Sequence, residues 1–144
     1  MLLDMLARSS AEPEDRLSVD RRRVLALLAA IRKHHLESRV VLQSFDFRTL
    51  HAMKKLAPEI KLSALYSGAP RDFVEIGKEA RAQIVSPEAR LVTAAQVKSA
   101  HAAGMEVLPW TANTPEEWSR LVAAGVDGII SDDPAALIAF LKKK

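Results

Sequence analysis

Short apolar runs rich in β-branched and aromatic residues alternate along this chain with longer stretches of helical periodicity. Five such runs are strand candidates, and their starts lie about 21–23 residues apart: Val40–Phe45, Lys61–Tyr66, Ala82–Ser86, Met105–Trp110 and Val126–Ser131. That interval holds one strand and one helix and is too long for a hairpin. The runs at Val40–Leu42 and Gly128–Ile130 do not alternate with charged residues, which is typical of parallel strands covered on both faces.

The stretches between these runs carry the signals of helix ends. Two of them fit the capping box, in which a threonine and a later side chain satisfy free amides at the helix start: Thr93 with Gln96, and Thr114 with Glu117. Asp133 before a proline predicts another helix start, while Gly104 and Gly125 stand where helices should stop. Apolar residues at helical spacing predict core faces: Val24, Leu27, Leu28 and Ile31; Trp118, Leu121 and Val122; Leu137, Ile138 and Leu141.

The first forty residues depart from this pattern. Residues 1–17 mix charge, serine and proline without a period, so we expect a poorly ordered lead-in, followed by a helix from about Ser18 to His34. Residues 18–144 then form a single α/β domain with five parallel βα units. Two architectures accommodate them, an open doubly wound sheet of the flavodoxin kind and part of an eight-stranded βα barrel. The spacing of the strands does not separate the two.

Composition narrows the class of protein. The 144 residues are 49% apolar and 27% charged, with both signs interspersed, which excludes a disordered chain. No apolar run approaches the roughly 20 residues of a membrane span, and the first residues lack a secretory signal, so we expect a cytoplasmic protein. The formal net charge of +3 is small and dispersed, so we expect no nucleic-acid partner. The absence of cysteine excludes disulfides and thiolate chemistry.

In either architecture, functional residues collect at the carboxyl ends of the parallel strands. Four segments, in this order, resemble the glycerophosphodiester phosphodiesterase family over roughly residues 20–140: 40–46 (VVLQSFD), 100–104 (AHAAG), 109–113 (PWTAN) and 125–132 (GVDGIISD). The resemblance implies a partial TIM barrel, (βα)8, in which the five βα units are barrel strands 4–8.

The same resemblance implies a reaction. The intact family hydrolyses glycerophosphodiesters to an alcohol and glycerol 3-phosphate, with magnesium or calcium and two histidines as acid and base. Its catalytic motifs stand on the first three strands: His-Arg-Gly, Glu and Asp ligands, a His-Asp pair and Glu-x-Lys. Only Glu59-Ile60-Lys61 spells one of them, and it opens a strand, so we interpret it as coincidence. We therefore assign no catalytic residue, metal ligand or cofactor to this chain and expect the chain alone to be inactive.

The remaining histidines and acidic residues have structural explanations. All four histidines fall inside or at the end of predicted helices: His34, His35, His51 and His101. Asp46 and Asp133 are explained as helix caps. Asp132 stands beside Asp133 at a strand end, but no third carboxylate is identifiable nearby, so the sequence predicts no metal site.

What survives of the family's site is the wall that faces the substrate. The resemblance makes Phe45 and Trp110 the apolar lining of the glycerol or leaving-group pocket, with Ser44 and Gln43 beside them. A large ring at a strand end, before a polar loop, is an independent reason to assign Trp110 to a site. Ordinary core packing is the alternative for both aromatic residues.

Three hypotheses result. The first is a chain of the glycerophosphodiester phosphodiesterase family without its first three strands, so whether the chain is an enzyme stays open. The second is a non-catalytic phosphoester-binding or assembly module. The third is a flavodoxin- or receiver-like open-sheet domain, which is disfavoured because the first strand ends Ser44-Phe45 without a receiver's acidic cluster. An arc of five strands leaves open edges and an apolar face, so we expect a homo-oligomer or a complementing N-terminal fragment.

Overall fold

The computed structural model describes residues 2–4 and 13–143, with side chains from Arg21 onward. Over these residues five parallel strands form one sheet in chain order: β1 (Leu2–Asp4), β2 (Val41–Ser44), β3 (Lys61–Tyr66), β4 (Ile84–Pro87) and β5 (Glu106–Val107). The helices are α1 (Pro13–Lys33), α2 (Phe47–Leu56), α3 (Phe73–Ala80), α4 (Ala94–Ala102), α5 (Pro115–Ala124) and α6 (Pro134–Leu141), with a 3₁₀ turn η1 (Ala89–Leu91). The parallel α/β class predicted from the sequence is confirmed.

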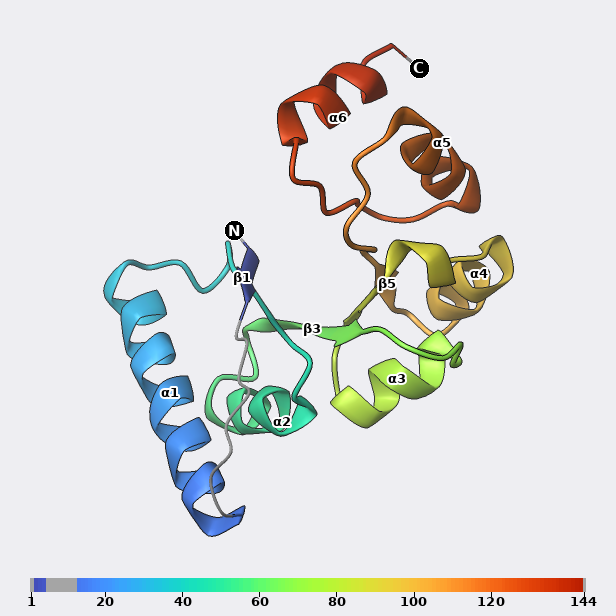
Figure 1. The fold of residues 1–144 in the computed structure, drawn as a ribbon. Coiled ribbons are helices and arrows are strands. Elements are labelled where there is room, and N and C mark those ends of the chain that lie inside the picture. The colour runs from blue at the N-terminus through green and yellow to red at the C-terminus, as the bar shows by residue number, and fades with distance from the viewer. Residues whose placement is uncertain (1, 5–12, 144) are drawn as a thin grey trace.

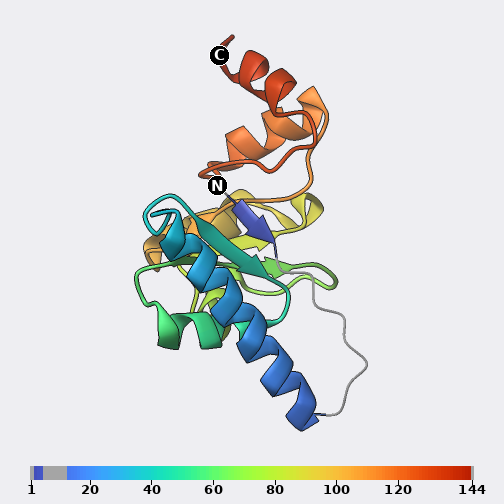
Figure 2. The same cartoon turned by 90° about the vertical axis from the view of Figure 1, so that its left-hand side faces the viewer.

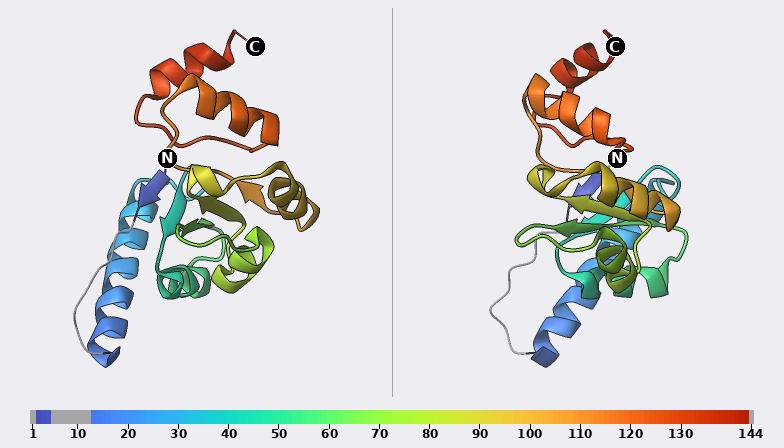
Figure 3. Two further views of the ribbon diagram at one scale, coloured as in Figure 1. Left: turned by 45° about the vertical axis from the view of Figure 1, so that its right-hand side comes forward. Right: turned by 90° about the vertical axis from the view of Figure 1, so that its right-hand side faces the viewer.

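The helices follow one another around the outside of a curved sheet. Each helix packs against the next, from α1 to α6. Figure 1 shows them on an arc that runs from α1 on the left, past α2, α3 and α4, to α5 and α6 at the top. The two ends of this arc do not meet, as the turned view of Figure 2 also shows. Figure 3 shows α5 and α6 as a pair beyond β5, set apart from the sheet. None of the described helices is long and apolar enough to cross a membrane.

The two faces of the sheet carry different side chains, because paired residues of a parallel sheet point to the same side. The helix-facing side holds part of the hydrophobic core: Leu42, Leu62, Ala64, Val85 and Val107. The concave side is buried as well, but it mixes polar and apolar residues: Gln43, Ser63, Leu65, Ile84 and Ser86. The sheet therefore presents a partly polar inner surface.

Two regular elements fall within residues 1–17, where we expected none. Strand β1 pairs with β2, with Leu2 opposite Val41 and Asp4 opposite Gln43. Helix α1 begins at Pro13 and not at Ser18, and a proline suits the first helical position because its fixed φ is already helical. A strand of three residues is too short to show a periodicity in the sequence. Residues 1 and 5–12 lie outside the described residues, so the expectation for them stays a prediction.

Strand lengths also differ from the prediction toward the C-terminus. The strand at Lys61–Tyr66 is confirmed. Strand β4, which was predicted at Ala82–Ser86, begins two residues later than predicted, at Ile84. The predicted strand Met105–Trp110 is regular only at Glu106–Val107, and Trp110 rejoins the sheet through an isolated parallel bridge to Glu88.

The predicted strand at Val126–Ser131 is not a regular strand. Its backbone does run alongside β5: the Asp127 N–H donates to the Val107 oxygen at 3.1 Å, and the Ile130 N–H donates to the Pro109 oxygen at 2.9 Å. Two features interrupt the ladder between them. The Val107 N–H donates to the side chain of Asp127 (Oδ2, 2.7 Å), and Pro109 has no N–H to donate.

Most of the predicted helix ends are confirmed. The Thr114 side chain accepts from the Glu117 N–H, and the Glu117 side chain returns to the cap backbone, which completes the capping box. Asp133 caps α6 with Pro134 after it. Gly125 ends α5 at φ +85°, in the left-handed region that favours glycine.

The second predicted capping box is only half formed. The Thr93 Oγ1 accepts from the Gln96 N–H at 3.3 Å. The Gln96 side chain, however, reaches across to the start of α3 instead of back to Thr93. Its Oε1 accepts from the Phe73 N–H at 3.2 Å, and its Nε2 donates to the Arg71 oxygen at 3.0 Å. Gln96 therefore joins α4 to α3.

Candidate functional site

The two aromatic residues predicted to line a pocket contact each other. Phe45 follows β2 and Trp110 follows β5, and their rings meet edge to face with centroids 5.5 Å apart. Strands β3 and β4 lie between them, so in a flat sheet their strands would be about 14 Å apart. The curvature of the sheet therefore brings the carboxyl ends of β2 and β5 toward a common centre. We call this pair the aromatic wall.

Trp110 is held firmly within the aromatic wall. Its indole Nε1 donates to the Ser86 oxygen at 2.7 Å. Its backbone N–H donates to the Pro87 oxygen at 3.0 Å, and its own oxygen accepts from the Ala89 N–H. Phe45, by contrast, is 42% exposed. One ring is thus anchored to β4, and the other exposes apolar surface.

Gln43 and Ser44 take opposite sides of β2. Gln43 is only 6% exposed, and its Oε1 has no hydrogen-bond partner among the side chains described from Arg21 to Lys143 or the described backbone, an arrangement that costs about 1–3 kcal/mol. Ser44 is fully buried on the helix-facing side, and its Oγ accepts from the Asp46 N–H at 3.0 Å. Ser44 therefore shapes the turn into α2, and the structure does not bring it to the aromatic wall. The roles of these residues in binding stay predictions.

Two buried serines on the concave side were missed in the sequence. Ser63 and Ser86 are fully buried, and their hydroxyl oxygens lie 2.7 Å apart. Ser63 stands opposite Gln43 in the register of β2 and β3. The signal for this polar patch was a single serine among the apolar residues of each of two strands, Lys61–Tyr66 and Ile84–Pro87.

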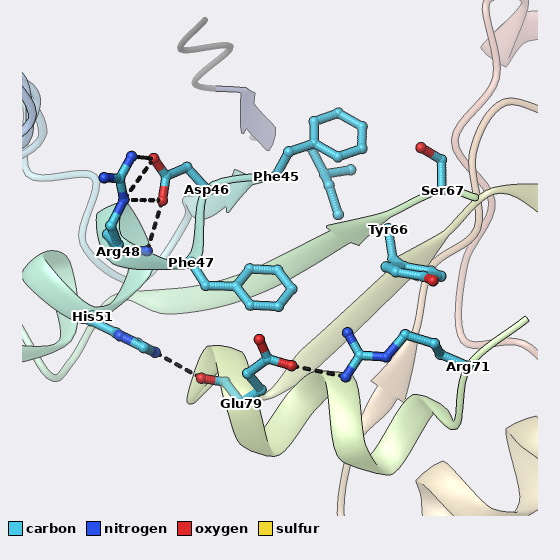
Figure 4. Close-up of a pocket in the computed structure, with 10 residues that line it drawn as sticks. Phe45, Asp46, Phe47, Arg48, His51, Tyr66, Ser67, Arg71 and Glu79 are labelled. Carbon is cyan, nitrogen blue, oxygen red and sulfur yellow. Dashed lines mark hydrogen bonds and ion pairs between the residues drawn. The ribbon is translucent and has the colours of Figure 1, made fainter. Parts of the chain in front are cut away.

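A groove of about 650 Å³ opens beside the aromatic wall, between α2 and α3. Figure 4 shows Phe47 and Tyr66 pointing toward each other across it. Its lining comes from the end of β3, the two strand-to-helix loops and the helices that follow: Phe45, Asp46, Phe47, Arg48, His51, Leu65, Tyr66, Ser67, Arg71 and Glu79. We call it the α2–α3 groove. The sequence did not predict it, because its lining is spread over 35 positions, from 45 to 79.

The charged groups of the α2–α3 groove form two ion pairs. The Arg48 side chain donates hydrogen bonds to both carboxylate oxygens of Asp46, and its Nε lies 2.9 Å from Oδ1 and 3.1 Å from Oδ2. The hydrogen bond from the Arg48 side chain lowers the pKa of Asp46, which also caps α2 as predicted. The Arg71 Nη2 donates to the Glu79 Oε2 at 2.8 Å, and this bond raises the pKa of Arg71.

Acidic and histidine side chains elsewhere are engaged in structural bonds. The Asp132 Oδ2 accepts from Asn113 at 2.7 Å, and the Asp133 Oδ1 accepts from the Ala136 N–H at 2.9 Å. His101 pairs with Asp127 at 2.8 Å, at the end of α4. Over residues 21–143, no three His, Asp or Glu side chains gather closely enough to hold a metal ion. The donors that the structure describes therefore do not fit a divalent cation.

Comparison with known proteins assigns this architecture to a class. A sequence profile of the Glycerophosphoryl diester phosphodiesterase family matches residues 3–136. A protein of Caldanaerobacter subterraneus subsp. tengcongensis named Glycerophosphodiester phosphodiesterase is 32% identical over 117 residues, which are 81% of this chain and 48% of that protein.

Solved structures agree with that assignment. A Silicibacter pomeroyi protein assigned to the glycerophosphoryl diester phosphodiesterases is 29% identical, with a TM-score of 0.89 over 99% of this chain and 50% of its own. An Oleispira antarctica phosphodiesterase, solved with its product sn-glycerol-3-phosphate, shares the fold at 22% identity and a TM-score of 0.78, over 87% of this chain and 51% of its own.

The chain belongs to the glycerophosphoryl diester phosphodiesterase family. The resemblance inferred from the four sequence segments is thereby confirmed, and the flavodoxin- or receiver-like alternative is wrong. Members of the family are generally metal-dependent. The chain spans about half the length of the relatives it matches.

Proposed function

We propose that this chain forms part of a barrel that hydrolyses glycerophosphodiesters, and that it supplies the wall against which the substrate lies. The observation that carries the proposal is the edge-to-face contact between Phe45 and Trp110. This contact supports a sheet that curls toward one centre at its carboxyl end, the face on which barrels of this kind bind substrates. Gln43 lies on the same side of the sheet, and its buried side-chain oxygen, which has no partner within the described part of the chain, is an acceptor suited to a substrate hydroxyl.

In this proposal residues 18–144 form a single partial domain whose five βα units are barrel strands 4–8. In this numbering β2 is barrel strand 4. Strand β1 is then barrel strand 3, because it pairs parallel with β2 and precedes it in the chain. The segment Val126–Ser131 stands as the last strand, since its backbone runs beside β5. Six parallel segments out of eight leave a gap of two strands.

The reaction breaks the bond between phosphorus and the leaving alcohol while water adds to phosphorus, and one proton passes to that alcohol. A bound magnesium or calcium ion would neutralise charge on the phosphoryl oxygens. The carboxylates described in this chain do not fit such an ion, so we derive no catalytic step from them. The chain's own contribution is to bind and orient the apolar part of the substrate and to exclude water from it.

A turnover assay tests this division of roles. We expect the chain alone to show no hydrolysis of glycerophosphocholine with magnesium or calcium, because the family's His-Arg-Gly and metal-ligand motifs do not occur in its sequence. Release of glycerol 3-phosphate above the uncatalysed rate would contradict the proposal. A longer chain or an added fragment that carries those motifs should restore turnover, and Trp110→Ala should then raise KM.

The open arc also predicts association. The two uncovered edges and the concave side favour a homo-oligomer or a complementing N-terminal fragment. Six parallel segments from each of two copies would give twelve, which exceeds the eight of a closed barrel, so the complementing fragment is the better fit. Light scattering that shows a monodisperse monomer, with no apolar surface accessible to a dye, would count against association.

A non-catalytic phosphoester-binding or assembly module is the second candidate. The observation that favours it is the presence of an aromatic wall together with the structural bonds of the strand-end carboxylates Asp132 and Asp133. Binding of glycerophosphodiesters without turnover, even after complementation with the missing motifs, would select this candidate over the first.

A further inference from the structure

The α2–α3 groove has the size of a small-molecule site and adjoins the aromatic wall. Its volume of about 650 Å³ lies within the range of ligand pockets. We propose that the groove binds the alcohol part of the substrate and that this alcohol is a neutral polyol. The inference rests on the proposed function, because Phe45 lines the groove and also packs against Trp110.

The paired charges of the groove disfavour a charged ligand. Each guanidinium already faces a carboxylate, Arg48 with Asp46 and Arg71 with Glu79. An anion such as phosphate would have to draw an arginine away and leave a carboxylate unpaired. A quaternary ammonium meets the opposite obstacle, since the Arg71 guanidinium lies 5.7 Å from the centre of the Tyr66 ring, where such a cation would bind.

Hydroxyl groups suit this lining because each both donates and accepts a hydrogen bond without adding charge. The Glu79 side chain is 55% exposed and bonds Arg71 through one oxygen only, so its carboxylate can also accept from a hydroxyl. The Arg71 side chain is 39% exposed, and its planar fork carries five N–H donors. The His51 Nε2 lies 2.7 Å from the Glu79 backbone oxygen. Since a carbonyl oxygen can only accept, the ring nitrogen is the donor of this hydrogen bond.

The aromatic side chains define the shape of the ligand. Phe47 and Tyr66 face the groove from opposite sides, with Glu79 and Arg71 below them (Figure 4). The Tyr66 hydroxyl donates to the Ala69 oxygen at 2.7 Å, which fixes the position of the ring. A cyclic polyol has apolar C–H faces that pack against such rings and hydroxyls at its edge that reach the charged groups. The groove therefore matches a ring of this kind.

Binding to the full chain tests the chemistry of the groove. Titration with myo-inositol, followed by NMR, should shift the signals of Phe47, Tyr66 and His51, whereas choline and inorganic phosphate should not. The Glu79→Gln variant should weaken inositol binding about fivefold, the loss of one charged hydrogen bond, and Phe47→Leu should weaken it while keeping apolar volume. Glu116→Gln on α5 is the matched control and should bind as the unchanged chain does.

Several outcomes would overturn the inference. Choline or phosphate binding at the same residues as tightly as inositol would exclude a neutral polyol. If the inositol-induced shifts map to residues outside the groove, the site is excluded. The same holds if Glu79→Gln and Glu116→Gln weaken inositol binding equally.

The role as a subsite for the leaving alcohol has its own test. Glycerophosphoinositol should bind more tightly than free inositol, because its phosphoglycerol part also reaches the aromatic wall. Equal affinities would mean a site for free polyols and would overturn the assignment to the substrate. These measurements need no turnover, so an absence of hydrolysis after complementation would refute the proposed function and leave the polyol site standing.

Discussion

Two parts of the sheet are held together in different ways. Strands β2, β3 and β4 share a continuous parallel ladder, from Val41 opposite Lys61 to Tyr66 opposite Pro87. Residues 105–132 rely more on side chains: the Asp127 carboxylate accepts from the Val107 N–H, and an asparagine at 113 bridges to Asp132. We call the first part the ladder region and the second the bridged region.

The difference follows from the residues in each part. Every position of β2 and β3 supplies a backbone N–H, and Leu42, Leu62 and Ala64 on the helix-facing side are apolar and buried. In the bridged region Pro109 interrupts the ladder, and single polar side chains take over its bonds. The ladder region should therefore be destabilised most by the loss of a buried apolar side chain, and the bridged region by the loss of one polar side chain.

The largest effect is expected in the ladder region. Leu62 is fully buried in β3, so Leu62→Ala should lower the free energy of unfolding by about 3 kcal/mol through lost contacts and a residual cavity. The measurement is the urea midpoint of the full chain. Leu25→Ala on α1 is the matched control, because Leu25 is 43% exposed, and it should cost less than about 1 kcal/mol. Equal losses in the two variants would contradict the comparison.

A smaller effect is expected in the bridged region. Asp127→Ala leaves the buried Val107 N–H without its acceptor, which should cost about 2 kcal/mol. Asp127→Asn retains a carbonyl oxygen in the same place and should recover most of that loss. His101→Ala removes only the exposed partner of Asp127 and should cost less than about 1 kcal/mol. If Asp127→Asn is as unstable as Asp127→Ala, the negative charge of Asp127, and not its oxygen as a hydrogen-bond acceptor, stabilises this region.

The same contrast explains what the sequence predicted well. The ladder region has long apolar runs and a regular spacing, so its strands and the cap at Asp46 were predicted within two residues. In the bridged region the apolar run Val126–Ser131 resembles a strand, but one carboxylate and one proline decide its conformation. Side-chain bonds between distant residues leave no periodic signal.

The candidate site divides in a similar way. Phe45 and Trp110 were singled out by the family resemblance, and Trp110 also by its large ring at a strand end; the structure brings the two rings into contact. Ser44 looked equivalent to Gln43, but strand alternation turns its side chain to the other face. The α2–α3 groove depends on ion pairs such as Arg71 with Glu79, eight residues apart, whose geometry is set only once the helices pack.

The smallest expected effect is a difference between the two regions in how their stability depends on pH. Asp46 in the ladder region and Glu117 in the bridged region both have a lowered pKa in the folded chain, Asp46 through the hydrogen bond from Arg48 and Glu117 through the Asn113 N–H. A lowered folded pKa gives stability that is present above the unfolded values of 3.8 and 4.5 and is lost as the pH falls through the folded values.

Urea midpoints of the unchanged chain, Asp46→Asn and Glu117→Gln, each measured at pH 7 and at pH 3, test this dependence on pH. Each variant should lose less stability on acidification than the unchanged chain. The flattening should be greater for Asp46→Asn, because the Asp46 carboxylate is paired with the Arg48 guanidinium, whereas the Glu117 carboxylate is bonded to the neutral donors of Asn113 and Thr114. Parallel acid curves for the unchanged chain and both variants would show that neither carboxylate contributes to the acid sensitivity of its region.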